Sequence, residues 1–279
     1  MVSFRFLKTA FNSGDYYKSI NEALRSDNGS YRMLHYPYYI SEKDNFSQAQ
    51  NNLIDYCICK LSDIEGKDIL DIGCGNGIAA LYIADKYPVK GLICVDINTD
   101  NIKIADEEKR RRKIENVTFI EGDAQNLIQL GSNSIDIIIN IESAFHYPEK
   151  ELFLEEIYRI LKPRGQFIIT DILTTSEGSL LLKRWKRKMK YNHWSFSRYN
   201  DAFSESKLTL KSKDDITDKV ILGFEAFRNY IKELRNKGKM NDIFSKLFLI
   251  FNLRLNVCLL KKRRKYYVFY GEKQESVLR

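Results

Sequence analysis

The sequence predicts an α/β fold built on a doubly wound, mostly parallel β-sheet. Three observations support this prediction: short apolar strands alternate with helices, a glycine-rich turn follows the first strand, and acidic residues follow successive strands. Near-continuous apolar strands separated by helices of about 10–15 residues are typical of a parallel sheet buried on both faces. Right-handed crossovers then place helices on both faces and ligands at the carboxyl ends of the strands.

The core elements follow one another from about residue 46 to residue 172. The first is an amphipathic helix over residues 46–61, in which Leu53, Ile54 and Cys57 recur at helical spacing. The next elements are a strand at Asp68–Ile72, a helix at Ile78–Lys86, a strand at Gly91–Asp96, a charged helix at 100–113, strands at Val117–Glu121 and Ile135–Ile141, a helix at 149–161 and a strand at 166–171. The run Lys162-Pro163-Arg164-Gly165 ends the last of these helices.

The alternation stops after residue 172. Residues 174–265 are mostly helical in pattern, basic and aromatic, and 266–271 (YYVFYG) read as one last strand. A strand this late indicates that the helices before it are inserted over the mouth of the sheet. We therefore expect an N-terminal helical lid over residues 1–45, a core over 46–173, a helical cap over 174–265, and the last core strand with a tail over 266–279.

Composition narrows the class of protein only in part. A chain of 279 residues favours one large domain with decorations, and its formal charge of +8 would suit an acidic ligand, a nucleic acid or an anionic membrane. Five cysteines without a CxxC pair, beside three histidines, predict no metal site and read as buried apolar residues in a reducing compartment. The N-terminus lacks the pattern of a secretory signal, so we expect a cytoplasmic protein.

Two basic segments have more than one interpretation. The run 183–190 could meet an acidic substrate or form a solvated helix face. The apolar stretch 243–260 and the basic residues 261–265 could together seat a helix on an anionic membrane, form a homodimer contact, or cover the underside of the cap. Lys246 and Arg254 lie inside that stretch, which disfavours a membrane span.

The turn after the first strand has the sequence Asp71-Ile-Gly73-Cys74-Gly75-Asn-Gly77. Glycine permits the positive φ angles of a tight strand-to-helix turn and lets a ligand approach the backbone. The second strand ends at Asp96, where a carboxylate can bind both hydroxyls of a ribose. Dinucleotide sites normally have GxGxxG spacing, whereas here it is GxGxG after an aspartate. A carboxylate there repels a phosphate but suits a ligand with an ammonium and a sulfonium.

This combination resembles the class I, Rossmann-like S-adenosylmethionine-dependent methyltransferases, and the resemblance covers residues 46–172. It implies a seven-stranded sheet, S-adenosyl-L-methionine as cofactor and S-adenosyl-L-homocysteine as product. It also implies roles for individual residues: Asp71, Gly73, Cys74 and Gly75 hold the methionine moiety, Asp96 binds the ribose, Ile97 packs on the adenine, Asp123 with Ala124 binds the adenine amino group, and Asn140 and Ile141 offer backbone carbonyls to the ammonium.

The segment after the fourth strand, NIESAFHYP over residues 140–148, resembles the loop found in small-molecule methyltransferases that act on sugars, polyketides, sterols and phosphoethanolamine. The sequence lacks the (N/D)PP(Y/F) tetrapeptide of amino-methylating nucleic-acid enzymes and a Pro-Cys nucleophile. We therefore expect a small-molecule acceptor and no nucleic acid.

His146 and Asp171 are the candidate catalytic pair, because they follow the fourth and fifth strands, which neighbour each other in this fold. An imidazole with a pKa near its ordinary value of about 6.5 could remove the proton of an acceptor hydroxyl, with Asp171 orienting the ring. The leading hypothesis is therefore O-methylation. The alternatives are N- or C-methylation of an amine, phosphobase, lipid or isoprenoid, and a cofactor-binding module that activates a partner without chemistry of its own.

Several aromatic and polar residues are candidates for a lid or an acceptor contact. The cluster of His35, Tyr36, Tyr38 and Tyr39 could close over the cofactor or pack as ordinary aromatic core. Glu142 could bind a substrate hydroxyl or belong to a plain loop, and Tyr147 lies in the same segment.

Overall fold

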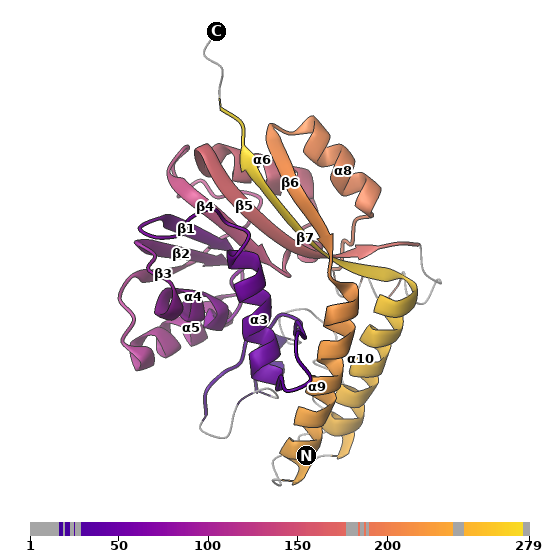
Figure 1. Ribbon diagram of the computed structural model, residues 1–279. Coiled ribbons are helices and arrows are strands. Elements are labelled where there is room, and N and C mark those ends of the chain that lie inside the picture. Colours follow the sequence, from indigo (N-terminus) through magenta and orange to yellow (C-terminus); the bar gives the residue numbers. More distant parts are fainter. Residues whose placement is uncertain are drawn as a thin grey trace.

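The computed structural model describes residues 17–18, 20–22, 25, 29–176, 184, 187, 190–236 and 243–275. Figure 1 shows a central twisted sheet with helices on both faces. The elements are α3 (Phe46–Ile58), β1 (Asp68–Ile72), α4 (Ile78–Lys86), β2 (Gly91–Asp96), α5 (Thr99–Arg112), β3 (Val117–Glu121), β4 (Ile135–Ile141), the 3₁₀ turn η1 (Ala144–His146), α6 (Lys150–Ile160), β5 (Leu161–Thr174), α8 (Phe196–Glu205), β6 (Leu208–Asp215), α9 (Thr217–Asn236), α10 (Ile243–Lys262) and β7 (Arg264–Lys273).

The sheet has seven strands in the order β3-β2-β1-β4-β5-β7-β6. Strands β1 to β5 are parallel, and β7 runs antiparallel between β5 and β6. The predicted doubly wound, mostly parallel, seven-stranded sheet is therefore confirmed, as is the placement of helices before the last strand. In this order the carboxyl ends of β1, β2 and β4 lie side by side, which brings the residues after these strands to one edge.

Two apolar clusters cover the two faces of the sheet. One unites α3, α4 and α5 with residues such as Val220 and Phe224 of α9 and Leu260 of α10. The other lies under α6 and α8 and includes Phe153, Tyr199 and the β7 residue Phe269. Burial of both faces explains why strands such as β4 (IDIIINI) are mostly apolar, with five isoleucines in seven residues.

Strand β6 was not predicted. It lies within the segment 174–265 that was expected to be mostly helical, and it forms the outer edge of the sheet beside β7. Its sequence LTLKSKDD has few apolar residues, because an edge strand pairs on one side only and Lys211, Lys213 and Asp215 are exposed to solvent there. The helices α9 and α10 of that segment were expected and are present.

Some boundaries differ from the predictions. The strand expected at 166–171 is the centre of the much longer β5, which also contains the Lys162–Gly165 run expected to terminate a helix. Its pairing with β4 is irregular between Ile135 and Ile137, so this run forms a bulged start to the strand. At the other end, β7 begins two residues before the predicted strand, at Arg264.

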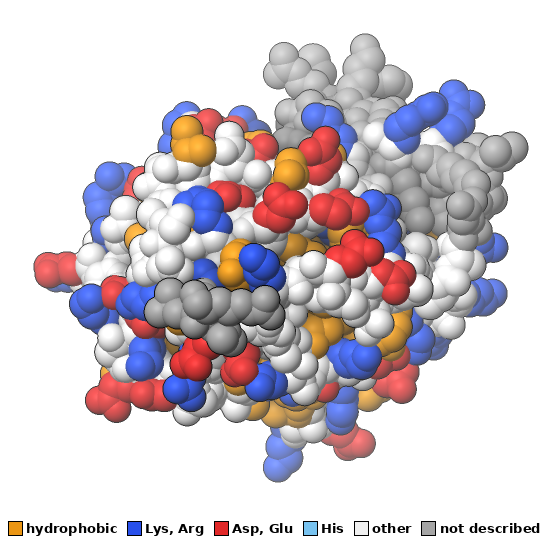
Figure 2. All heavy atoms as spheres, turned by 90° about the horizontal axis from the view of Figure 1, so that it is seen from above, with side chains coloured by type: hydrophobic (Ala, Val, Ile, Leu, Met, Phe, Trp, Pro, Cys, Tyr) orange, Lys and Arg blue, Asp and Glu red, His pale blue; other side chains and the backbone are white. Residues whose placement is uncertain are grey.

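The surface carries both signs of charge. Figure 2 shows Lys and Arg interspersed with Asp and Glu among the described residues on the face seen from above. None of the helices in the described part of the chain is both long and apolar enough to cross a membrane. Most of the basic run 183–190, and the side chains at the start of α10, lie outside the described residues, so their interpretations stay predictions.

Candidate functional site

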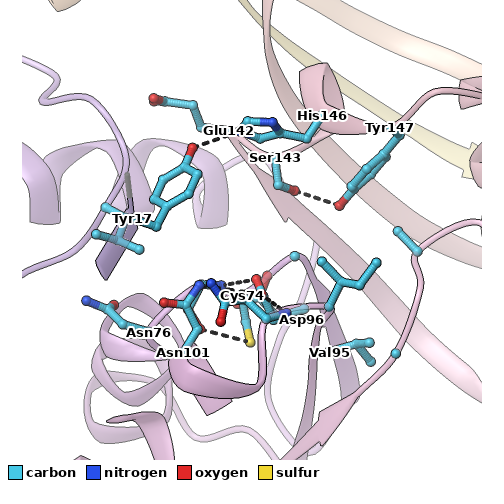
Figure 3. A pocket seen from close by; sticks show the side chains of 18 of the residues that line it. Tyr17, Cys74, Asn76, Val95, Asp96, Asn101, Glu142, Ser143, His146 and Tyr147 are labelled. Atoms are coloured by element: carbon cyan, nitrogen blue, oxygen red, sulfur yellow. Dashed lines mark hydrogen bonds between the residues drawn. The ribbon is translucent and has the colours of Figure 1, made fainter. Parts of the chain in front are cut away.

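A cavity of about 700 Å³ opens at the carboxyl ends of the parallel strands. It is lined by all of the predicted cofactor residues except Asn140, namely Asp71, Gly73, Cys74, Gly75, Asp96, Ile97, Asp123, Ala124 and Ile141. Figure 3 shows two groups of side chains that face each other across the space. We call one side of the cavity the glycine-loop wall and the other side the β4 wall. The glycine-loop wall consists of Asp71, Cys74, Asn76, Asp96, Ile97, Asn101, Asp123 and Ala124, and the β4 wall of Glu142, Ser143, His146 and Tyr147.

The glycines of the turn after β1 are required by backbone geometry. Gly73 and Gly77 have φ angles of 75° and 73°, which side-chain-bearing residues rarely adopt. A Cβ at Gly77 would also lie 2.6 Å from Cβ of Ala105 and 2.7 Å from the Phe119 ring. The turn can therefore pack tightly against α5 and β3 while its backbone stays open to the cavity.

Two acidic residues of the glycine-loop wall are kept close together and away from water. Asp71 is 3% exposed, and burial together with the charge of Asp96 raises its pKa to about 7. Burial also raises the pKa of Asp96. No hydrogen bond to the Asp71 carboxylate is found in the described part of the chain, so a cationic ligand could neutralise it.

Asp96 is connected to a chain of asparagines that the sequence did not reveal. Its carboxylate accepts hydrogen bonds from the backbone N–H of Gly75 at 2.8 Å and of Asn98 at 2.8 Å, and a longer one from Asn101 at 3.4 Å. Asn21 donates to Asn101 at 3.1 Å and accepts from Asn76 at 2.7 Å. The N-terminal segment is therefore linked to the glycine turn and to the carboxylate that follows β2.

The outer part of the same wall is apolar. Ile97 is 70% exposed, which is unusual for an isoleucine. Its apolar side chain is therefore free to pack against a ring of a ligand. Across from it, the Asp123 carboxylate accepts hydrogen bonds from the backbone N–H of Gln125 at 2.9 Å and from its side chain at 3.1 Å. Ala124 beside it is buried and lines the cavity.

Asn140 lies behind the cavity instead of lining it. Its side-chain amide donates to the carbonyl of Ile72 at 2.8 Å, to Ser143 Oγ at 2.7 Å and to the Tyr147 hydroxyl at 3.0 Å. Ser143 and Tyr147 are also hydrogen-bonded to each other at 2.8 Å, as Figure 3 shows. Asn140 thus joins the ends of β1 and β4 and fixes the start of the β4 wall.

His146 reaches the cavity from the end of η1. Its Nε2 lies 2.8 Å from the hydroxyl of Tyr17, a residue of the N-terminal segment (Figure 3). Burial, followed by the charge of Lys150, lowers the pKa of His146 to about 4. The imidazole is therefore neutral at pH 7, and its pKa lies well below the unperturbed value expected from the sequence.

The predicted pairing of His146 with Asp171 is not present in the structure. The Asp171 carboxylate is fully buried and accepts hydrogen bonds from Lys150 Nζ at 2.6 Å and from the Tyr199 hydroxyl at 2.6 Å. Asp171 pairs with Lys150 instead of His146, because Lys150, at the first turn of α6, brings a positive charge to this carboxylate inside the core. A buried carboxylate must be compensated, and the ammonium does this better than a neutral imidazole.

Glu142 is more than a plain loop residue. Its φ angle is 55°, a strained value for a residue with a side chain, and its carboxylate accepts from the Tyr36 N–H at 2.6 Å and the Tyr266 hydroxyl at 2.9 Å. Burial raises the pKa of Glu142 to about 8. The β4 wall therefore carries a neutral imidazole and a weakly acidic carboxyl group side by side.

The predicted lid residues have different positions. His35 lines the cavity, and Tyr36 reaches Glu142 through its backbone. Tyr38 stacks on Tyr56 with ring centroids 4.9 Å apart, and the Tyr39 N–H donates to the carbonyl of Lys219 in α9. Tyr38 and Tyr39 thus attach this segment to α3 and α9, while His35 and Tyr36 are turned towards the site.

The two walls divide the chemistry of the cavity. The glycine-loop wall offers carboxylates and an apolar surface to a cationic, ribose-containing ligand, and the donor set fits S-adenosylmethionine. The β4 wall offers a proton acceptor to a second molecule. Sequence reasoning missed Tyr17, Asn21, Asn76 and Asn101, because no motif connects the N-terminal segment with the glycine turn.

Comparisons with known proteins agree with this geometry. A family model described as "Methyltransferase domain" matches residues 63–238. The chain is 29% identical to a fatty-acid O-methyltransferase of Mycolicibacterium smegmatis, over 67% of this chain and 60% of that protein. It is 32% identical to a phthiotriol/phenolphthiotriol dimycocerosates methyltransferase of Mycobacterium tuberculosis, over 41% of each chain. The chain therefore matches less than two thirds of the length of these relatives.

Two solved structures share the fold at low sequence identity. One is a putative sarcosine dimethylglycine methyltransferase from Galdieria sulphuraria, with a TM-score of 0.77, 17% identity and coverage of 93% of this chain and 98% of that one. The other is phosphoethanolamine N-methyltransferase 2 of Haemonchus contortus, with a TM-score of 0.73, 18% identity and coverage of 80% and 53%.

Proposed function

This chain belongs to the methyltransferase domain family and is a class I S-adenosylmethionine-dependent methyltransferase, and from that premise we propose that it methylates an oxygen atom of a small, largely apolar molecule. The observation that carries the proposal is the cavity with two unlike walls, one acidic and one bearing His146. Two relatives support the choice of acceptor, since the name of one specifies fatty-acid O-methylation and that of the other phthiotriol or phenolphthiotriol dimycocerosates.

The glycine-loop wall is proposed to hold the cofactor, which supplies an activated methyl group on a sulfonium. Asp71, with the backbone of Gly73 and Gly75, would bind the methionine part, and Asp96 would bind the ribose. Ile97 would cover one face of the adenine, and Asp123 with Ala124 would lie at its edge. The raised pKa of Asp71 supports this assignment, because a positive ligand would restore its ionised form.

His146 is proposed to accept the proton of the acceptor hydroxyl. Its Nε2 accepts a hydrogen bond from Tyr17 in the tautomer that keeps this nitrogen unprotonated, and the Tyr17 hydroxyl marks where an acceptor hydroxyl can bind. Because the pKa of His146 is about 4 without ligand, the ring is neutral at physiological pH, so no proton has to leave it before an acceptor hydroxyl binds. Asp171 is not part of this proposal, since its carboxylate is committed to Lys150 and Tyr199.

Transfer to a nitrogen or carbon atom is the alternative function. Glu142 is the observation that favours it, because a carboxyl group between Tyr36 and Tyr266 could stabilise a cationic amine or a developing carbocation at this wall. An acceptor amine can lose its proton before it binds, so such a reaction would depend little on His146.

The test is methyl transfer from labelled S-adenosylmethionine to three C12 acceptors, an alcohol, a carboxylic acid and an amine, by the parent and His146→Ala. We expect the variant to lose about 10²–10⁴-fold in kcat on the alcohol, the usual contribution of a positioned base. Loss on the acid should be small, because a carboxylic acid is already ionised at pH 7. Cofactor affinity, measured by calorimetry, should not change. Equal turnover of the alcohol by both proteins would exclude His146 as the base, and methylation of the amine alone would replace the O-methylation proposal.

A further inference from the structure

Three lysine and arginine side chains are buried in the described part of the chain: Lys150, Arg264 and Lys273. Lys150 forms an ion pair with Asp171 at 2.6 Å. Lys273 donates hydrogen bonds to Asn133 Oδ1 at 2.6 Å and to the carbonyl of Leu161 at 2.7 Å. Both follow the rule that a buried charge is compensated by hydrogen bonds or an opposite charge.

Arg264 does not follow this rule. It is 6% exposed, and neither a hydrogen bond nor an ion pair of its guanidinium is found among the residues that the structure describes. Its nitrogens are not among the fully enclosed side-chain atoms that lack a partner, so they keep some contact with open space. Burial lowers its pKa, and the ionisable groups that act on it in the opposite direction are the phenols of Tyr36 and Tyr191. A guanidinium has five N–H donors and cannot become neutral in a protein, so leaving it without an acceptor is costly.

The position of Arg264 connects it to the candidate site. It is the first residue of β7 and pairs with Thr174, the last residue of β5, so it lies at the sheet edge where the parallel strands end. Tyr266, two residues further along and on the same face of the strand, donates to Glu142 of the β4 wall. Tyr36, which also donates to Glu142, is one of the two phenols near the guanidinium.

The second phenol leads to the same wall. The Tyr191 ring lies 5.2 Å from the His146 ring and 5.4 Å from that of Phe145. Arg264 thus interacts electrostatically with two tyrosines that each adjoin a residue of the β4 wall, and these three residues lie outside the lining of the 700 Å³ cavity, next to that wall. A cation with nearby phenols in a region of low dielectric is the arrangement that binds an oxyanion.

We propose that Arg264 binds an anionic oxygen group, a carboxylate or a phosphate, carried by the acceptor. The inference rests on the proposed function and specifies its substrate class: the acceptor is an acid or a phosphate whose charged group lies under the cap beside Tyr36 and Tyr191. Guanidinium and oxyanion neutralise each other on binding, which explains why this position keeps a charge that the fold itself leaves uncompensated.

The binding test uses protein saturated with S-adenosylhomocysteine and three probes of equal chain length, dodecanoate, dodecyl phosphate and dodecanol, titrated by calorimetry. We expect the parent to bind one or both of the anions more tightly than dodecanol, by about 10-fold or more. Arg264→Met should bind the anions and dodecanol with equal affinity. The matched control is Arg263→Met, which removes the same charge from the neighbouring exposed position and should keep the preference. Equal binding of anion and alcohol by the parent, or an unchanged preference in Arg264→Met, would overturn the proposal.

Thermal unfolding without ligand separates a binding role from a structural one. Arg264→Met should unfold at the same temperature as the parent or higher, because an uncompensated charge is removed. Lys273→Met, which breaks satisfied hydrogen bonds, should unfold at a lower temperature. A clear decrease for Arg264→Met would assign Arg264 to the fold. Binding of S-adenosylhomocysteine by the parent reports on the proposed function independently, so its failure is distinguishable from loss of the anion preference alone.

Discussion

At the scale of single residues, the site is governed by burial. The same removal from water lowers the pKa of His146 to about 4 and raises that of Asp71 to about 7 and that of Glu142 to about 8. All three groups therefore favour their neutral forms at pH 6 in the absence of ligand. A cation bound next to Asp71 would lower its pKa again and return this carboxyl group to its ionised form.

The raised pKa of Glu142 has a consequence for stability. In the unfolded chain this carboxyl group ionises near pH 4.5, and in the folded protein near pH 8. Between these values unfolding releases a proton, so the contribution of Glu142 to stability is lost as the pH rises from about 5 to 8. Glu142→Gln keeps an acceptor for Tyr36 and Tyr266 but cannot ionise.

We therefore expect the free energy of unfolding of the parent to fall by on the order of 1–2 kcal/mol more between pH 6 and pH 8 than that of Glu142→Gln. The unfolding temperature of the parent should fall more over the same range. Scanning fluorimetry across this range measures the difference. Glu65→Gln, at an exposed position, is the control and should parallel the parent. Parallel curves for the parent and Glu142→Gln would show that this carboxyl group ionises normally.

At this scale, the positions of acidic residues that follow a strand could be predicted from the sequence. Asp71, Asp96 and Asp123 follow successive strands of a parallel sheet, so their convergence on one edge follows from topology. Asp171 also ends up at the predicted edge, but its partner was assigned wrongly. Lys150 and Tyr199, which donate hydrogen bonds to its carboxylate, are brought to it by α6 and α8, and no local sequence pattern predicts these contacts.

At the scale of elements, side chains of the N-terminal segment connect it to both walls of the cavity. Asn21 is buried and connects Asn76 of the glycine turn with Asn101 of α5, while Tyr17 reaches His146 across the cavity. A lid over the cofactor was one of two interpretations of this region. These contacts support the lid, although the aromatic residues Tyr38 and Tyr39 serve to anchor it.

Asn21→Ala tests that role. It removes hydrogen bonds to Asn76 and Asn101, each contributing about 1 kcal/mol, so we expect S-adenosylmethionine affinity to fall about 3- to 30-fold with little change in kcat. Calorimetry and initial rates measure the two effects. Lys18→Ala, one turn away on the exposed side of the same segment, should behave as the parent. Unchanged affinity in Asn21→Ala would mean that this segment does not cover the cofactor.

Elements were predictable to different degrees. The strands of the parallel core are buried on both faces, so their apolar runs stand out in the sequence. Strand β6 has the same hydrogen-bonded geometry on one side, but Lys211, Lys213 and Asp215 give it the composition of a solvent-exposed segment. Edge strands avoid apolar side chains because unpaired edges aggregate, and this removes the signal by which strands are recognised.

At the scale of the whole molecule, the fold joins one region whose site residues follow a sequence motif and another region whose site residues do not. The part from β1 to β5 carries a recognisable motif, and most of the cofactor residues predicted from it line the cavity, whereas Asn76 and Asn101 were not predicted. The proposed acceptor end combines β4, the start of β7 and the segments before α3 and α8, which lie far apart in the sequence. Arg264, Tyr36 and Tyr191 come together only in the folded chain, so no local sequence pattern points to the anion site that we propose.

The central claim is that the glycine-loop wall binds S-adenosylmethionine, and calorimetric titration of the parent and Asp96→Ala tests it most directly. We expect the parent to bind S-adenosylmethionine and not NAD, because Asp71 suits a cation and repels a pyrophosphate. Asp96→Ala, shown to be folded by circular dichroism, should bind about 10- to 100-fold more weakly, since the ribose hydroxyls lose a charged acceptor. Unchanged affinity in the folded variant would contradict the ribose assignment, and tighter binding of NAD than of S-adenosylmethionine would contradict the account as a whole.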